Sequence, residues 1–172
     1  MSVRTASRRG RVRERPARYE DRVSGPVYFD SSALLKLYLP EPGSDDLDRA
    51  LEGRDDLLAS DLTVTEIVSA LARRVRDGAL SSDQARLVRR SLVAGLEAGP
   101  YGHVDLDRSI HRDAERLMLD RHDVSLRAAD ALHLALAISA RAGTIATFDR
   151  RLGAAARAVG IGTYPSIHPE EA

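Results

Sequence analysis

The stretch "VYFDSSALLKLY", residues 27–38, joins an apolar run to a helical pattern and decides the fold. Val27–Phe29 is predicted to be a short buried strand, and the helix expected over 32–39 ends at Pro40, because proline interrupts a helix interior. Asp30 stands between the two elements. A carboxylate at the end of a buried strand loses much of its hydration, so a partner in the folded protein must offset this cost.

The same alternation of short apolar runs and helical patterns continues along the rest of the chain. Further strands are predicted at 57–59, 103–106, 144–148 and 161–164. Helices are predicted at 44–51, 63–77, 82–98, 109–119, 126–140 and 152–159. Strands that alternate with helices are joined by crossovers, which produce a parallel sheet. The sequence therefore predicts an α/β fold, a three-layer α/β/α sandwich with a central parallel sheet.

The composition describes a globular chain of one domain: 172 residues, of which 43% are apolar and 30% charged. No apolar run approaches the length of a membrane span, and the arginine-rich N-terminus does not resemble a secretory signal, so we expect a cytoplasmic protein. The absence of cysteine excludes disulfides, thiolate catalysis and cysteine-ligated metal sites. Any metal ion must be held by oxygen or histidine.

The net charge of zero hides an uneven distribution. Residues 1–24 contain eight arginines and three acids, a net charge of +5, so the rest of the chain carries −5. With few large apolar residues, this basic tail is expected to be disordered or loosely attached, and the folded domain to span 25–168. The tail is interpreted either as an arm that attracts phosphates or as a dispensable extension.

Four acids follow or flank the predicted strand ends. Asp30 and Asp149 come directly after strands, Glu66 lies in the first turn of the helix after the second strand, and Asp130 lies early in the apolar helix at 126–140. In parallel α/β folds, ligands bind beyond the carboxyl ends of the strands. We therefore expect the four acids to meet at one edge of the sheet.

Each acid also has a purely structural explanation. Glu66 stands three residues after Thr63, the spacing of a capping box. Asp130 can complement a helix dipole, and Asp30 and Asp149 can cap the helices that follow them. Four independent caps at the same edge are the less economical explanation.

A cluster of carboxylates repels itself unless a counter-charge is present. Mg²⁺ or Mn²⁺ removes this repulsion, because these hard cations prefer carboxylate and water oxygens. Such a site suits phosphodiester hydrolysis, since the cation activates a water and offsets the charge of the phosphate. The provisional partner of Asp30 is therefore a divalent cation.

Four segments carry a family resemblance: "YFDSSALLKLY", "TVTEIVSAL", "LRAADALHLALA" and "IATFDRRL". In this order and at these separations they resemble the motifs of PIN-domain ribonucleases, most closely the VapC toxins of bacterial type II toxin–antitoxin pairs. The resemblance covers about 26–165 and implies an α/β/α sandwich that cleaves RNA with Mg²⁺ or Mn²⁺. The implied catalytic and metal-binding acids are Asp30, Glu66, Asp130 and Asp149.

The resemblance also implies supporting residues. Thr147, two residues before the last acid, is expected to orient a ligand or a metal-bound water, and Ser31 to play a similar part. Lys36, Arg150 and Arg151 lie near the motifs and can hold the RNA backbone, although arginines on a solvated helix face are more common.

His133, three residues after Asp130, is interpreted either as a metal ligand or general base, or as a satisfied core histidine, which is the commoner case. The resemblance implies a VapB-type antitoxin as partner, contacting the region from Leu34 to Leu51, and both a homodimer and a hetero-oligomer with the antitoxin. The alternative function is a non-catalytic PIN-like module that binds RNA or protein.

Overall fold

The computed structural model describes residues 23–121 and 125–166, and within them five parallel strands form one sheet. The strands are β1 (Val27–Phe29), β2 (Leu57–Ser60), β3 (Tyr101–Val104), β4 (Thr144–Ala146) and β5 (Gly162–Tyr164). Their order is β3-β2-β1-β4-β5, so β1 lies at the centre. Most of the predicted basic tail, residues 1–22, and the end of the predicted domain, 167–168, lie outside the described residues.

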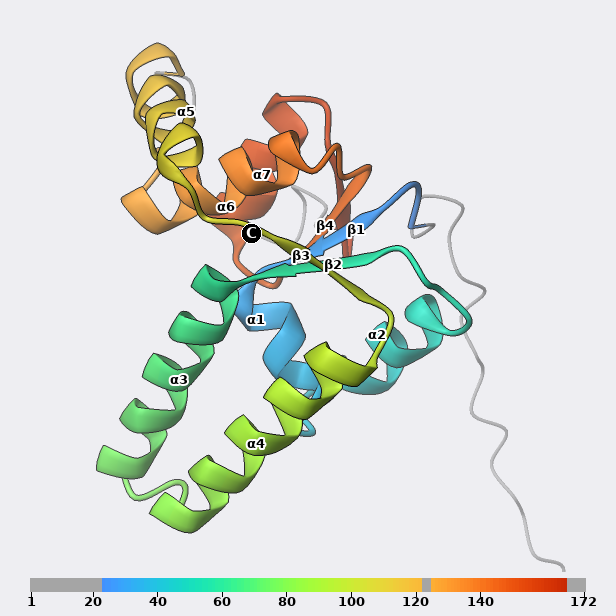
Figure 1. Cartoon of the computed structure of the whole chain (residues 1–172), viewed down its shortest axis with the longest axis vertical. Coiled ribbons are helices and arrows are strands. Elements are labelled where there is room, and N and C mark those ends of the chain that lie inside the picture. The colour runs from blue at the N-terminus through green and yellow to red at the C-terminus, as the bar shows by residue number, and fades with distance from the viewer. Residues whose placement is uncertain (1–22, 122–124, 167–172) are drawn as a thin grey trace, which may run out of the picture.

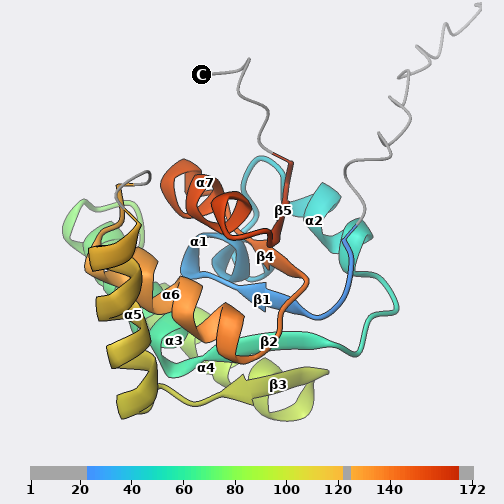
Figure 2. The same ribbon diagram turned by 90° about the horizontal axis from the view of Figure 1, so that it is seen from above.

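Helices cover both faces of the sheet, as Figures 1 and 2 show. Below the sheet in Figure 1 lie α1 (Ser31–Leu34), the 3₁₀ turn η2 (Leu35–Leu37), α2 (Ser44–Leu51), α3 (Asp61–Arg76) and α4 (Ser82–Ala98). Above it lie α5 (Arg108–Asp120), α6 (Ala128–Ser139) and α7 (Arg150–Ala158). The predicted three-layer α/β/α sandwich with a parallel sheet is confirmed.

The side chains of β1 alternate between two cores, as the period of a strand requires. Val27 and Phe29 pack in the cluster that contains Ile67 of α3. Tyr28 faces the other way, into the cluster that contains Leu134 of α6. All three β1 residues are fully buried, which explains why this strand is apolar along its whole length rather than alternating.

Several element boundaries differ from the sequence prediction, each for a local reason. The helix expected over 32–39 is one α turn followed by η2. The helix expected from Thr63 starts at Asp61, because Ser60 caps it and accepts a hydrogen bond from the Thr63 amide. The strand expected over 103–106 lies at 101–104, in register with β2, where the ring of Tyr101 packs edge-on against Phe29.

The apolar helix α6 begins two residues later than expected. Asp130 accepts a hydrogen bond from the backbone amide of Arg127, which closes the first turn at Ala128. Nearly every residue from Asp130 to Ala137 is buried, as predicted for a central helix. Among the helices of residues 23–121 and 125–166, none is both long and apolar enough to cross a membrane.

Candidate active site

Asp30 lies at the carboxyl end of β1, where it caps α1, and is only 4% exposed. Its Oδ1 accepts hydrogen bonds from the Ala33 amide at 2.9 Å and the Ser32 hydroxyl at 2.8 Å. Its Oδ2 accepts a hydrogen bond from the Thr147 hydroxyl at 2.7 Å. Burial raises the pKa of Asp30 above its usual value, and these hydrogen bonds oppose that rise only in part. Among the described residues, the partners of the Asp30 carboxylate are therefore a helix amide and two hydroxyls.

Thr147 joins the turn after β1 to the turn after β4. Its fully buried hydroxyl donates to Asp30 and accepts a hydrogen bond from the Asp149 amide at 3.0 Å. The amide of Phe148 adds a second link by donating to the Ser32 hydroxyl at 2.8 Å. Thr147 therefore contacts the Asp30 carboxylate and the Asp149 backbone, and its predicted role in orienting a ligand or a metal-bound water stays a prediction.

Asp149 caps α7 but does not directly follow its strand, because β4 ends at Ala146 rather than at 148 as predicted. Its Oδ1 accepts hydrogen bonds from the amides of Arg151 and Leu152, at 2.7 and 3.3 Å. Unlike Asp30, its residue is exposed to solvent. The helix-capping explanation therefore describes a contact that both aspartates make, one in a buried turn and one in an exposed turn.

Glu66 lies on α3 and points across to two other elements. Its Oε2 accepts hydrogen bonds from the Ser31 hydroxyl and from His133 Nε2, each at 2.8 Å. The hydrogen bond from His133 is the main reason that the pKa of Glu66 is lowered. The capping-box explanation for Glu66 is wrong, because the cap of α3 is Ser60 and the residue three positions later is Thr63.

Asp130 lies in the first turn of α6 and is 9% exposed. Its Oδ2 accepts the Arg127 amide at 3.0 Å and lies 4.0 Å from Arg151 Nη1. The structural explanation, that Asp130 stabilises the start of its helix, therefore describes a real contact. The guanidinium of Arg151 also brings α7 next to this acid.

Contacts through intermediate residues link the four acids at the same edge of the sheet. Thr147 connects Asp30 with Asp149, Ser31 follows Asp30 and reaches Glu66, and Arg151 lies between Asp149 and Asp130. This edge is at the carboxyl ends of the central strands, as the topology predicts.

The donors at this edge fit a hard divalent cation in kind, because they are all carboxylate oxygens. In each of three acids, one carboxylate oxygen accepts no hydrogen bond from any described residue. These oxygens are Glu66 Oε1, Asp130 Oδ1 and Asp149 Oδ2. In the described part of the chain, however, no three His, Asp or Glu side chains are gathered so that they could hold an ion as they stand. The metal-binding role of the four acids stays a prediction.

Of the three basic residues predicted to contact RNA, Lys36 is engaged within the chain. Its ammonium donates to Glu41 Oε2 at 3.1 Å and to the Pro42 carbonyl at 3.0 Å, and it lies 4.5 Å from the centre of the Phe148 ring. Arg150 is exposed at the start of α7, next to Arg151. Contacts of these three residues with RNA remain predictions.

His133 is the residue near the acids whose contacts the sequence did not reveal. It is 3% exposed and both of its ring nitrogens have partners: Glu66 at Nε2 and the Tyr28 hydroxyl at Nδ1, 2.9 Å away. His133 is therefore a buried histidine with both nitrogens satisfied, as the core interpretation expects, and one of its two partners is an acid of the candidate site. The only sign of a functional role for His133 in the sequence was its spacing from Asp130. That spacing does not show that His133 contacts Glu66, on a different helix.

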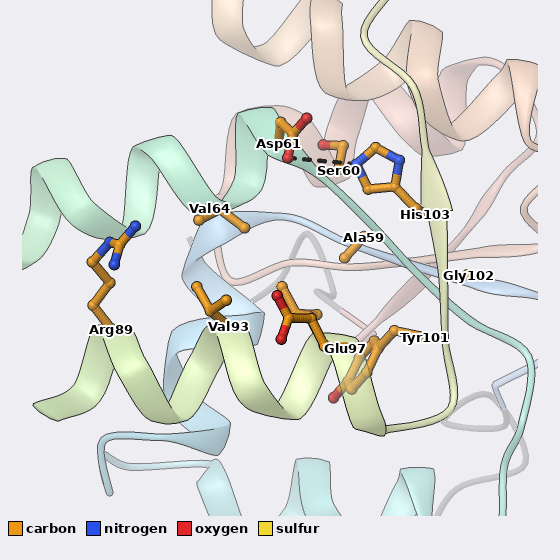
Figure 3. Close-up of a pocket in the computed structure, with 11 residues that line it drawn as sticks. Ala59, Ser60, Asp61, Val64, Arg89, Val93, Glu97, Tyr101, Gly102 and His103 are labelled. Atoms are coloured by element: carbon orange, nitrogen blue, oxygen red, sulfur yellow. Dashed lines mark ion pairs between the residues drawn. The ribbon is translucent and has the colours of Figure 1, made fainter.

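A pocket of about 490 Å³ lies beside this edge, between α3, α4 and the strands β2 and β3 (Figure 3). Its lining is mainly apolar, with Val64, Val93 and Tyr101 among the residues that point into it. At its rim His103 Nε2 lies 3.5 Å from Asp61 Oδ1. None of the four acids is among the residues that line this pocket.

Residues 27–158 match the family model of the PIN domain. The chain belongs to the PIN-domain family. Two relatives from Mycobacterium tuberculosis show that it is of the VapC ribonuclease type. Ribonuclease VapC49 is 33% identical over 142 residues, which cover 81% of this chain and 95% of that protein. Ribonuclease VapC46 is 32% identical over 137 residues, which cover 78% of this chain and 93% of that protein.

A solved PIN-type structure agrees with the fold. The crystal structure of Mycobacterium tuberculosis VapC20, described as a toxin that cleaves the sarcin-ricin loop, superposes with a TM-score of 0.61 over 75% of this chain and 94% of VapC20. The sequence identity is 14%, so this likeness supports the fold alone. The resemblance seen in the four sequence motifs is confirmed by the family match and by the relatives.

Proposed function

We propose that this chain is a metal-dependent endoribonuclease and the toxin of a type II toxin–antitoxin pair. The observation that carries the proposal is the placement of four acids at one edge of a PIN-type sheet, where Thr147, Ser31 and Arg151 link them. Relatives named as VapC ribonucleases, about a third identical over most of the chain, support the same activity.

Asp30, Glu66 and Asp130 would hold Mg²⁺ or Mn²⁺, and Asp149 would complete the site or take a second ion. The cation would lower the pKa of the attacking water and offset the charge on the scissile phosphate. The chain supplies the orientation: Thr147 and Ser32 fix Asp30, and Ser31 and His133 fix Glu66.

Contacts with the RNA and with partner proteins belong to the same proposal. Arg150 and Arg151 lie beside the acids at the start of α7 and would contact the RNA backbone, with Lys36 as a further candidate. A VapB-type antitoxin would cover the region from Leu34 to Leu51, and the toxin would form a homodimer and a hetero-oligomer with its antitoxin. We place this pair in the cytoplasm.

The test is cleavage of RNA by the full chain, freed of any antitoxin, with Mn²⁺ or Mg²⁺ and with excess EDTA. We expect cleavage only with the cation, leaving 5′-phosphate ends. Asp130→Asn should lose the activity, whereas Asp55→Asn, the same change at an exposed loop position, should retain it. Equal cleavage by the two variants, or cleavage that survives EDTA, would contradict the proposal.

One observation keeps the alternative of a non-catalytic PIN-like module in view. Within the described residues, the acids are bound to protein donors and are not gathered around a common point. If the wild-type chain binds RNA in a gel-shift assay but cleaves none of it with either cation, this alternative is the correct one.

A further inference from the structure

We propose that His133, held in place by Tyr28, is a positioning residue that fixes the Glu66 carboxylate for the divalent cation. This inference deepens the proposed function and rests on it. Three elements take part: α6 supplies His133, β1 supplies Tyr28 and α3 supplies Glu66.

The contacts form one continuous chain of polar groups, all of them buried except the half-buried Glu66. His133 Nε2 lies 2.8 Å from Glu66 Oε2, and its Nδ1 lies 2.9 Å from the Tyr28 hydroxyl. The Tyr28 hydroxyl lies 2.9 Å from the hydroxyl of Ser60, which lies 3.2 Å from that of Thr63. The chain therefore extends from the exposed edge of the site into the centre of the fold.

The inner end of this chain is fixed by the backbone. The Thr63 hydroxyl donates a hydrogen bond to the backbone carbonyl of Phe29, 3.0 Å away. Phe29 is the residue directly before Asp30. Tyr28 and Thr63 are fully buried, and Ser60 is 1% exposed. Because close-packed side chains cannot shift without disturbing their neighbours, the position of the imidazole is set by the core rather than by Glu66.

Glu66 needs such support more than the other acids do. Its side chain is longer than that of an aspartate and half-buried, so it has more rotamers to lose when it binds a cation. His133 and Ser31 both donate to Oε2, which leaves Oε1 without a donor among the described residues. The protein therefore binds Glu66 through Oε2, and Oε1 is left to bind a ligand.

The arrangement also explains the spacing on α6. Residues three apart lie on neighbouring positions of a helix face, so α6 contributes Asp130 to the edge and, one turn later, the histidine that orients an acid from α3. A histidine that only filled the core would also need partners for both nitrogens. It would not need one of them to be an acid of the site.

The test measures Mn²⁺ affinity by calorimetry in a double-mutant cycle on the full chain: wild type, His133→Leu, Glu66→Gln and the double variant. We expect His133→Leu to raise the Kd for Mn²⁺ about 10-fold or more, the size of effect seen when a residue supporting a metal ligand is lost. In the Glu66→Gln background the same change should have no further effect, because the residue acts through Glu66.

Two further variants separate positioning from packing. Tyr28→Phe keeps the ring in the core and removes only the hydroxyl that holds His133, so it should weaken Mn²⁺ binding in the same direction. Thr144→Val removes a buried hydroxyl that bonds Ser24, near the start of β4. It should lower the melting temperature without changing the Kd for Mn²⁺.

The outcomes distinguish this inference from the proposed function. If Asp30→Asn abolishes Mn²⁺ binding while His133→Leu leaves it unchanged, the inference is overturned and the metal site stands. The inference is also overturned if the effects of His133→Leu and Glu66→Gln simply add. If the wild-type chain binds no Mn²⁺ and cleaves no RNA, the proposed function fails and the inference fails with it.

Discussion

Asp30, directly after β1, and Asp149, three residues after the end of β4, lie in the turns that follow two neighbouring parallel strands, and each caps the next helix. Asp30 accepts the Ala33 amide three residues on, and Asp149 accepts the amides of Arg151 and Leu152. The two turns differ in their surroundings. Asp30 is buried with a raised pKa, whereas Asp149 is exposed.

The difference shows that capping does not explain Asp30. A side-chain cap contributes about 1 kcal/mol wherever it stands, and an asparagine or serine would provide it without a buried charge. Keeping a carboxylate in the buried turn adds a desolvation cost that the exposed turn does not have. A bound cation would offset that cost, so the buried turn is where we expect substitution to affect function most.

The largest expected effect is therefore the loss of RNA cleavage caused by Asp30→Asn. Asparagine still caps a helix, so the change removes the charge and leaves the cap. We expect RNA cleavage to fall by more than about 100-fold, beyond the range for loss of a residue that merely supports a metal ligand. The measurement is the initial rate of cleavage with saturating Mn²⁺.

Asp149→Asn is the matched control in the exposed turn. It makes the same chemical change at the cap of the other helix and should reduce the rate less than Asp30→Asn does. If Asp149→Asn lowers the cleavage rate more than Asp30→Asn does, burial does not determine how much each acid contributes to the rate. The comparison of the two turns would then be wrong.

The next effect is on stability, at the residue that joins the two turns. Thr147→Val keeps the shape of the side chain but removes a hydroxyl that both donates to Asp30 and accepts from the Asp149 amide. Leaving a buried carboxylate and an amide short of a partner should lower the free energy of unfolding by about 1–3 kcal/mol. Urea denaturation measures this loss, and Thr147→Ser, which keeps the hydroxyl, should recover most of it.

The raised pKa of Asp30 predicts a slope of stability with pH. The folded state holds the proton of this carboxyl more tightly than the unfolded state does. Its contribution is therefore fully present below the usual pKa of 3.8 and is lost as the pH rises through the raised value. Without divalent cation, the stability of the wild type relative to Asp30→Asn should fall as the pH increases from about 4.

Glu66 has the opposite effect on the pH dependence of stability. Its pKa is lowered, so its contribution to stability is present above its usual pKa of 4.5 and is lost as the pH falls through the lowered value. Because both proteins contain Glu66, this opposite effect cancels in the difference between them. A difference that stays constant with pH would show that Asp30 is not desolvated as the structure indicates.

The fold could be predicted because its signals are local. The alternation of apolar runs and helical patterns identified every strand region, and the position of Asp30 and Asp149 after β1 and β4 placed them at one edge. Two helix boundaries failed because a polar side chain decides them: Ser60 starts α3 two residues early, and Asp130 starts α6 two residues late.

The contacts of the candidate site could be predicted only in part. The sequence singled out Thr147 as the residue two before Asp149 through a family resemblance, and no pattern showed that its hydroxyl bonds Asp30. The path from Glu66 to His133 and Tyr28 joins residues up to 105 positions apart in the chain. Such contacts depend on how α3, α6 and β1 pack together, and periodicity within one element carries no information about that packing.

The smallest expected effect is at the Asp149 cap itself. Asp149→Ala removes the acceptor of two amides at the start of α7 and should lower the free energy of unfolding by about 1 kcal/mol. Asp149→Asn, which retains a capping oxygen, should lose less in the same urea titration. If the two variants are equally unstable, the negative charge at the start of α7 contributes more than the cap does. The exposed turn would then resemble the buried one, with its carboxylate held for its charge.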